Sequence, residues 1–305
     1  MAEEYSKVLK DMSYEFEVVG NTKLGCDRFF QRTSIQAKPG STSKIKDTSG
    51  FKFAINAASS DQLFYTNKFL INKGIENILS EKPGALYLEE LQELQECSKA
   101  KKLFFCIAYN RRFYSSVDKL RELVKNEGGV ESFFFDFTEW EANVLNEGYN
   151  NEILRNWFAV NSLHVIDLAF FLGGNPTQLG SNISGGSNWH KPMTYSGSGI
   201  TNTDALFSYI ANWNSAGRWG IEVNTKSNKY ILRPLEKLQR IKKASTEMKF
   251  VQIKDSYDTY FKPGLYNQVK SFLSDQDDNR LITLEEHANN FKSIYVAILN
   301  GNQTL

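Results

Sequence analysis

Cysteine is scarce in this sequence, and its pattern excludes two common kinds of stabilisation. The 305 residues contain three cysteines, at positions 26, 97 and 106. They are odd in number, widely spaced and never in a CxxC pair, so the spacing indicates neither a disulfide framework nor a zinc site. We therefore predict no metal site and a reducing, cytoplasmic environment.

The sequence also lacks a charge imbalance and long apolar runs. Its formal net charge is +1, whereas a surface that binds nucleic acid normally leaves a marked basic excess. No run approaches the roughly 20 apolar residues of a membrane-spanning helix, and the first residues lack the basic-then-apolar pattern of a signal peptide. These absences argue against nucleic acid or a membrane as a partner.

Aromatic residues are abundant: there are 22 Phe, 14 Tyr and 5 Trp. Aromatic side chains suit sheet faces and sugar-sized pockets equally well, so their number alone does not distinguish the two. The hydrophobic fraction of 41% and the charged fraction of 23% are those of an ordinary globular protein. The chain is long enough for two domains, each with its own core.

Strand-like and helix-like segments alternate through about residue 110. Tyr5, Val8, Leu9 and Met12 form the apolar stripe of a first helix. The predicted strands are 16–19, 51–57, 75–80 and 103–109, and the predicted helices between them are 24–31, 59–74 and 86–102. This alternation indicates a doubly wound parallel sheet. In such a sheet a strand normally precedes the first helix, so we predict that the first strand is missing from this chain.

The pattern changes after about residue 115. A helix is predicted at 116–126, a strand at 131–140 and a helical run at 152–174. Consecutive strands follow at 177–184, 205–213, 218–225 and 229–235, and two helices close the chain at 262–275 and 283–301. A run of consecutive strands predicts a largely antiparallel sheet in an α+β domain. We place the domain boundary at 115, which gives domains of residues 1–115 and 116–305.

One triplet indicates a family. Glu81-Lys82-Pro83 stands between a predicted strand and a helix, where doubly wound folds bind ligands. Together with "AINAASSDQL", "IAYNRRFYSSV" and "NSLHVIDLAFFLGG", it resembles the Gfo/Idh/MocA family of NAD(P)-dependent oxidoreductases, which includes glucose-fructose oxidoreductase and inositol dehydrogenase. The resemblance covers almost the whole chain. It implies a Rossmann-like dinucleotide-binding domain followed by a substrate-binding and oligomerisation domain.

The resemblance implies hydride transfer between NAD or NADP and a secondary alcohol of a sugar or cyclitol. Removing hydride from a carbinol requires a base for the hydroxyl proton and a cation beside the developing alkoxide. Lys82 is the implied cation. His164 is the implied proton acceptor, since an unperturbed imidazole has a pKa of about 6.5. The implied substrate-binding residues are Tyr109, Asn110, Arg111, Asn161 and Asp167. We add Trp189 and His190, which stand in a predicted loop, because Trp faces pack on pyranose rings. The implied cofactor-binding residues are Asn21, Asn56, Ala57, Ala58, Glu81, Lys82 and Pro83.

Other roles remain open for several of these residues. Arg111 and Arg112 can instead pair with acids, and Trp189 with His190 can anchor a loop rather than edge a sugar pocket. Asp167 can orient the imidazole of His164, three residues before it. Many relatives carry an Asp where this chain has Val160, so the implied catalytic set reduces to Lys82 and His164.

The beginning of the chain departs from the family pattern. "MAEEYSKVL" resembles the interior of the helix that follows the family's first strand and its GxGxxG loop, so we predict an N-terminally truncated, incomplete Rossmann domain. That loop normally receives the dinucleotide pyrophosphate. Asn21 stands where an acidic residue would bind the adenosine ribose, which favours tolerance of NADP.

The resulting prediction is a sugar dehydrogenase or reductase that forms a homo-oligomer and takes part in surface polysaccharide biosynthesis. Two alternatives remain. One is a truncated, catalytically inactive relative that cannot bind dinucleotide. The other is a non-enzymatic sugar-binding or oligomerisation module.

Overall fold

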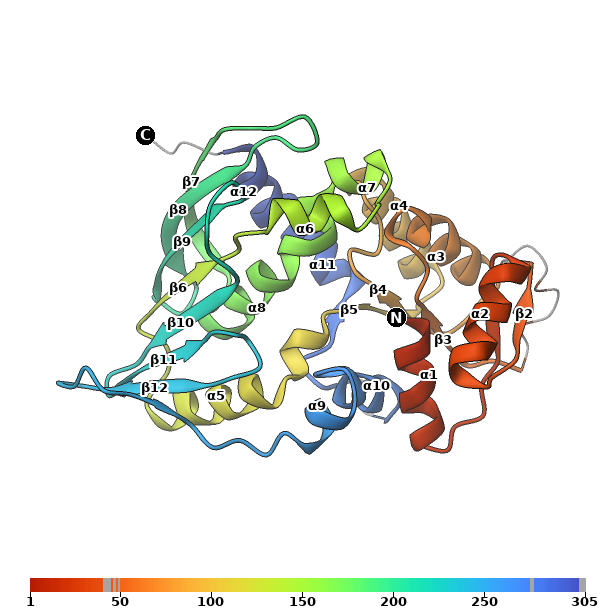
Figure 1. The fold of residues 1–305 in the computed structure, drawn as a ribbon, viewed down its shortest axis with the longest axis horizontal. Helices are drawn as coiled ribbons and strands as arrows, with labels where there is room; N and C mark the ends of the chain where they lie inside the picture. The colour runs from red at the N-terminus through yellow and green to blue at the C-terminus, as the bar shows by residue number, and fades with distance from the viewer. Residues whose placement is uncertain (41–44, 46–47, 49, 275–276, 302–305) are drawn as a thin grey trace. The chain divides into compact units, whose positions relative to one another are not determined.

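The computed structural model describes residues 1–40, 45, 48, 50–274 and 277–301. They form two compact units (Figure 1). Unit 1 comprises Met1–Asn110 and Ser256–His287. Unit 2 begins with Arg111–Asp255 and resumes at Ala288. Ser256–His287 thus packs with the first unit although it follows most of the second in the chain.

Unit 1 contains parallel strands, as the alternation of strands and helices predicts. Its larger sheet has the order β14-β5-β4-β3, in which β3 (Phe53–Asn56), β4 (Asn77–Glu81) and β5 (Phe104–Ala108) are parallel. β14 (Ile282–Thr283) pairs antiparallel with β5. β1 (Val18–Gly20) and β2 (Ala37–Pro39) form a separate parallel pair. The described parallel strands of unit 1 therefore belong to two sheets rather than to one continuous sheet.

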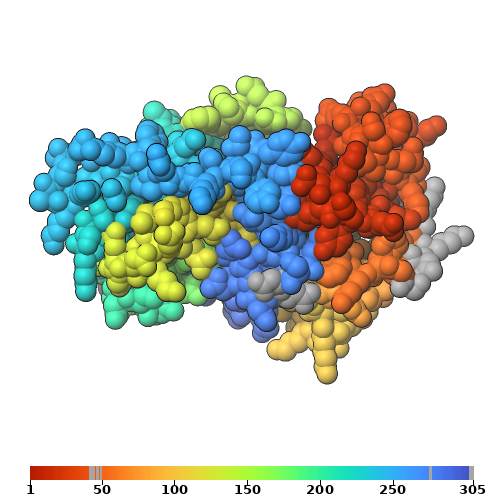
Figure 2. All heavy atoms as spheres, turned by 90° about the horizontal axis from the view of Figure 1, so that it is seen from below, coloured from red at the N-terminus to blue at the C-terminus, as the bar shows by residue number. Residues whose placement is uncertain are grey.

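Helices accompany these strands in unit 1: α1 (Ala2–Asp11), α2 (Lys23–Thr33), α3 (Leu63–Asn72), α4 (Leu88–Ala100), α9 (Ser256–Tyr260) and α10 (Leu265–Ser274). α1 packs against α10. The Lys7 ammonium lies 4.5 Å from the centre of the Tyr260 ring and donates to its carbonyl oxygen. Figure 2 shows the red N-terminal segment beside the blue segment that includes α9 and α10. The last residue of the helix predicted at 262–275 lies outside the described residues.

Unit 2 contains one eight-stranded sheet, with the order β13-β12-β11-β10-β6-β9-β8-β7. The strands are β6 (Ser132–Asp136), β7 (Pro176–Ser184), β8 (Thr194–Thr201), β9 (Leu206–Asn212), β10 (Gly220–Asn224), β11 (Asn228–Leu232), β12 (Gln239–Lys242) and β13 (Met248–Phe250). Every neighbouring pair is antiparallel except β6 and β9. The predicted combination of an α/β part and a largely antiparallel α+β part is confirmed.

Strand β8 was not predicted, because "TYSGSGIT" is rich in glycine and serine, which are weak strand formers. The structure gives the reason for its glycines. A Cβ atom at Gly197 would lie 2.4 Å from the carbonyl oxygen of Gly180, and one at Gly199 would lie 1.9 Å from that of Gln178. Glycine thus permits a close approach to β7 that a larger residue would prevent.

The remaining helices of unit 2 include α5 (Ser115–Asn126), α6 (Glu141–Asn146), α7 (Asn151–Arg155), α8 (Leu163–Gly173) and α12 (Val296–Asn300). α11 (Leu284–Asn290) begins in unit 1 and reaches unit 2 at Ala288. α8 packs on β6, where the buried Phe133 and Phe135 both meet the Phe170 ring edge to face. This aromatic contact is part of the core of unit 2 and holds α8, which carries His164, against the sheet.

The helical run predicted at 152–174 is not one continuous α-helix. It consists of α7, a π-helical turn at Phe158–Ser162, and α8. A π-helical turn inserts an extra residue and rotates the side chains that follow it, and such turns are frequent at functional sites. The candidate residue Asn161 lies in this turn, and His164 is the second residue of α8, which follows it.

Candidate active site

The turn after β4 carries Lys82 at the carboxyl end of a buried parallel strand. The Lys82–Pro83 peptide bond is cis, and Gly84 follows with a φ of +81°. A Cβ atom at Gly84 would lie 2.7 Å from Cδ1 of Ile107, so the turn is packed closely onto β5. Lys82 itself is half-buried, whereas Pro83 and Gly84 are buried.

A network of buried polar side chains forms hydrogen bonds with this turn. The Asn67 amide donates to Ser80 Oγ at 2.9 Å and to the Gly84 carbonyl at 2.8 Å. The Asn56 amide donates to Asn67 Oδ1 at 2.7 Å, and Asn56 Oδ1 accepts from the backbone of Ala58 at 3.2 Å. The structure therefore brings two predicted cofactor segments together, Asn56–Ala58 after β3 and Glu81–Pro83 after β4.

Glu81 is held by the first helix. The Tyr5 hydroxyl donates to Glu81 Oε1 at 2.7 Å. Burial raises the pKa of Tyr5 well above its ordinary value, and the Glu81 carboxylate raises it further, so Tyr5 remains a neutral donor. Asn21 is exposed just after β1.

His287, the third histidine of the chain, lies behind the same turn and was missed by the sequence reasoning. It is fully buried in the middle of α11 (Leu284–Asn290), which follows β14. Its Nε2 lies 3.0 Å from the Pro83 carbonyl, and its Nδ1 lies 3.4 Å from the Tyr109 hydroxyl. A carbonyl only accepts, so Nε2 carries the proton and Nδ1 accepts from Tyr109.

Two predicted substrate residues of unit 1 are buried. Tyr109 is 1% exposed and contacts His287, and the Asn110 amide donates to the Pro263 carbonyl at 2.9 Å. Both side chains thus contact the Ser256–His287 segment. Their predicted role in binding substrate stays a prediction.

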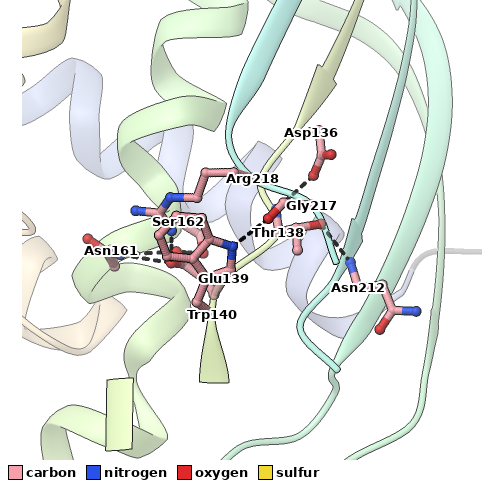
Figure 3. A network of polar contacts seen from close by, with 9 residues as sticks. All are labelled: Asp136, Thr138, Glu139, Trp140, Asn161, Ser162, Asn212, Gly217 and Arg218. Atoms are coloured by element: carbon pink, nitrogen blue, oxygen red, sulfur yellow. Dashed lines mark hydrogen bonds and ion pairs between the residues drawn. The ribbon is translucent and has the colours of Figure 1, made fainter. Parts of the chain in front are cut away.

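The second group of candidate residues belongs to unit 2 and surrounds Glu139, which the sequence reasoning placed in a strand. β6 ends at Asp136, and Glu139 follows in the loop with 1% exposure. Its carboxylate accepts from Asn161 Nδ2 at 3.0 and 3.1 Å and from Ser162 Oγ at 2.8 Å (Figure 3). Glu139 therefore fixes the π-helical turn that precedes His164. In the sequence, the one feature that could have singled out Glu139 was its place as an acid at the end of a predicted strand rich in aromatic residues.

Arg218 completes this group. Its Nη1 donates to Glu139 Oε2 at 3.1 Å. Burial raises the pKa of Glu139 above its ordinary value, while Arg218 and the neutral donors oppose that rise. The Arg218 guanidinium lies 4.8 Å from the ring centre of Trp140 and 4.4 Å from that of Trp219.

Trp219 joins this group to His164 and Arg111. The His164 and Trp219 ring centres are 6.2 Å apart, and His164 is 6% exposed. The Arg111 guanidinium lies 4.9 Å from the centre of the Trp219 ring. Within unit 2 the structure therefore brings together three predicted residues, Arg111, Asn161 and His164.

The other candidates of unit 2 lie in different surroundings. Asp167 is buried and accepts hydrogen bonds from Arg112 Nε at 2.7 Å and Nη2 at 2.6 Å, so Arg112 pairs with an acid. Trp189 donates to Glu141 Oε1 at 2.7 Å. His190 packs 4.6 Å from Trp213 with Nδ1 2.9 Å from the Pro192 carbonyl, and burial lowers its pKa. Trp189 and His190 thus anchor their loop in an aromatic cluster.

The residues after β3 and β4 fit the end of a dinucleotide that approaches the carboxyl edge of a parallel sheet. The described turns that lead from a parallel strand to a helix have no GxGxxG sequence, so we assign no residue to the pyrophosphate. Among the described residues no group of three His, Cys, Asp or Glu could hold a metal ion. The described helices include none long and apolar enough to cross a membrane.

The fold of this chain is similar to that of several solved dehydrogenase structures. UDP-N-acetylglucosamine 3-dehydrogenase GnnA from Acidithiobacillus ferrooxidans is 12% identical, with a TM-score of 0.74 over 98% of this chain and 93% of that one. A dehydrogenase (MviM) from Clostridium difficile is 17% identical, with a TM-score of 0.78 over 98% and 95%. Levoglucosan dehydrogenase, solved with NADH and levoglucosan, is 14% identical, with a TM-score of 0.74 over 98% and 92%.

The chain has the fold of the Gfo/Idh/MocA-type dehydrogenases. No protein-family model and no curated protein matches its sequence. The predicted Rossmann-like oxidoreductase fold is confirmed. The predicted loss of a first strand and glycine loop is not confirmed by these comparisons and stays a prediction.

Proposed function

We propose that the protein transfers hydride between NAD or NADP and a secondary alcohol of a sugar or cyclitol. The observation that carries the proposal is the Lys82 turn, which stands at the carboxyl edge of a parallel sheet on a buried network of Asn56, Asn67 and Ser80. The dehydrogenase fold supports it, as do two proteins of similar structure, GnnA, named for a nucleotide-linked sugar, and levoglucosan dehydrogenase, solved with NADH and levoglucosan.

Lys82 and His164 are the proposed catalytic residues. The nicotinamide, when bound, supplies or accepts the hydride. The Lys82 ammonium stabilises negative charge on the carbinol oxygen, and His164 takes or returns the hydroxyl proton. Because Glu139 fixes the turn before His164 through Asn161 and Ser162, it acts as a positioning residue.

The setting of this activity is also proposed. A cytoplasmic homo-oligomer that acts in surface polysaccharide biosynthesis fits the resemblance of the "NSLHVIDLAFF" helix to relatives in bacterial surface-sugar pathways. GnnA, whose name specifies a nucleotide-linked sugar, has the same fold. Light scattering of the purified protein tests the oligomer.

The activity is tested by titrating NADH and NADPH into the protein and then following absorbance at the nicotinamide band with a panel of sugars. Lys82→Met is expected to lower kcat roughly 100- to 1000-fold, because it removes the charge beside the developing alkoxide. Lys119→Met is the matched control, since Lys119 pairs with Glu122 on the exposed face of α5.

Absence of binding by either dinucleotide at millimolar concentration contradicts the proposed reaction. It favours the alternatives, an inactive relative or a sugar-binding module. Turnover that Lys82→Met leaves unchanged contradicts the assigned role of Lys82 and leaves the reaction itself standing.

A further inference from the structure

Two arginines and two tryptophans of unit 2 form a cluster, here called the Arg-Trp cluster, which consists of Arg111, Trp140, Arg218 and Trp219. Arg218 lies over both indole rings, at 4.8 and 4.4 Å, and Arg111 lies over Trp219 at 4.9 Å. The cluster adjoins the candidate catalytic residue, because Trp219 also contacts the His164 ring.

The buried carboxylate of Glu139 holds Arg218 in place. Glu139 is 1% exposed and accepts one hydrogen bond from Arg218 Nη1, while Asn161 and Ser162 occupy its remaining acceptor positions. The Trp140 indole donates to the Gly217 carbonyl at 2.6 Å and so holds the residue before Arg218 as well (Figure 3). The position of the guanidinium is therefore set before any ligand arrives.

Arg218 has more donors than Glu139 uses. A guanidinium presents five N–H groups in a planar fork, and Nη1 to Glu139 is its one hydrogen bond within the described residues. Its side chain is 39% exposed, and the neighbouring Trp140 is 47% exposed. The remaining donors can therefore reach a ligand that packs against the indole rings.

The charges of the group favour an anion. Arg218 contributes a positive charge that is partly exposed, and Glu139 is the carboxylate that contacts it. Burial raises the pKa of that carboxylate, which weakens rather than strengthens its negative charge. The Arg218 guanidinium also lies over two indole rings, a setting that a simple counter-ion for Glu139 does not require.

We propose that Arg218 binds an anionic group, a carboxylate or a phosphate, on the sugar substrate. This inference rests on the proposed function, since it assumes that the surroundings of His164 receive a sugar. A fixed arginine fork binds either anion through paired charge-assisted hydrogen bonds, and the exposed Trp140 provides an apolar face for the sugar ring. Arg218 thus determines substrate specificity.

The test measures binding without the cofactor, which separates it from the proposed reaction. D-glucose, D-glucuronate and α-D-glucose 1-phosphate are titrated into the full protein, with tryptophan fluorescence and calorimetry as readouts. We expect at least one of the two anions to bind roughly tenfold to a hundredfold more tightly than glucose, since a hydrogen bond to a charged group contributes that much. Added salt should reduce the difference, and the two anions distinguish a carboxylate from a phosphate site.

Arg218→Met should remove the preference for the anion and leave glucose binding unchanged. Arg218→Lys should restore only part of it, because an ammonium lacks the planar fork. Arg121→Met is the matched control, since Arg121 also stacks on an aromatic ring, that of Phe171, at 4.7 Å. Circular dichroism establishes that each variant is folded.

Equal binding of all three sugars, a preference that Arg218→Met does not change, or no binding of any of them overturns the inference. Dehydrogenase turnover of an anionic sugar with a KM that Arg218→Met does not change supports the reaction and refutes the role of Arg218. Anion binding through Arg218 without dinucleotide binding supports the role of Arg218 and refutes the reaction.

Discussion

Single residues in this protein join turns that lie far apart in the sequence, and His287 is the clearest example. It donates to the Pro83 carbonyl, 204 positions away, and accepts from Tyr109. A buried carbonyl that loses its donor retains the full penalty of its desolvation. His287 therefore stabilises the turn that carries Lys82.

Replacing His287 tests this contact. His287→Leu should lower the free energy of unfolding by about 1–3 kcal/mol, because the Pro83 carbonyl is left unsatisfied. His287→Gln should lower the free energy of unfolding by less, since the amide nitrogen of glutamine can donate to the Pro83 carbonyl in place of Nε2. Tyr109→Phe removes the contact at Nδ1 and keeps the hydrogen bond between Nε2 and the Pro83 carbonyl. Urea unfolding with an unchanged m-value measures all three, and equal stability of the Leu and Gln variants would refute the contact's role.

The pKa of Glu139 gives a second prediction at this scale. Because burial raises the folded-state pKa above the ordinary value of 4.5, the folded state binds the Glu139 proton more tightly than the unfolded state does. The stability from this proton is full below pH 4.5 and is lost as the pH rises through the folded pKa. Glu139→Gln keeps a neutral side chain and does not titrate.

The stability of Glu139→Gln relative to wild type should therefore increase as the pH rises from about 4 through this window. Chemical unfolding of both proteins across that range measures the difference. Glu222→Gln is the control. Glu222 lies on β10, pairs with Lys229 and is more exposed than Glu139. A difference that falls with rising pH would show that Arg218 outweighs burial and holds the pKa of Glu139 down.

At the scale of elements, the contact between α8 and β6 depends on a glycine. A Cβ atom at Gly173 would lie 2.2 Å from Cε1 of Phe133. Overpacking of this kind costs about 1–3 kcal/mol, whereas alanine gains only about 1 kcal/mol over glycine inside a helix. The steric effect should exceed the gain in helix propensity.

We therefore expect Gly173→Ala to lower the free energy of unfolding by up to about 2 kcal/mol. Thermal and urea unfolding measure the loss. Gly50→Ala is the matched control, since a Cβ atom there would meet nothing within 4 Å. An equal or higher stability of Gly173→Ala would show that Phe133 moves aside without cost.

Some helices and strands were predicted correctly from the sequence, and others were not. The predicted strand at 75–80 matches β4, and the predicted helix at 86–102 contains α4, because buried apolar runs and helical spacing are local properties of the chain. The helix predicted at 152–174 is divided by a π-helical turn. In this turn Asn161 and Ser162 donate hydrogen bonds to Glu139, which is distant in the sequence. Strand β8 was missed because its glycines serve contacts with β7 that the sequence does not display.

At the scale of the whole molecule, the chain divides into two units that are not two continuous segments. The predicted domains were residues 1–115 and 116–305, whereas Ser256–His287 contributes β14, α9, α10 and His287 to unit 1. A segment that returns to an earlier unit is held there by tertiary contacts such as those of Phe272 with Phe53 and Phe104. No local pattern in residues 256–287 indicates which sheet they will meet.

The sequence by itself determined the alternation of parallel strands and helices, the strand-rich second part and the position of Lys82 after a strand, because periodicity and short motifs act through neighbouring residues. Only the tertiary structure decided which side chains meet. It paired Glu139 with Arg218, 79 positions apart, and His287 with Pro83. Hydrogen bonds between such distant positions depend on the packing of complete elements, and packing is a property of the folded chain.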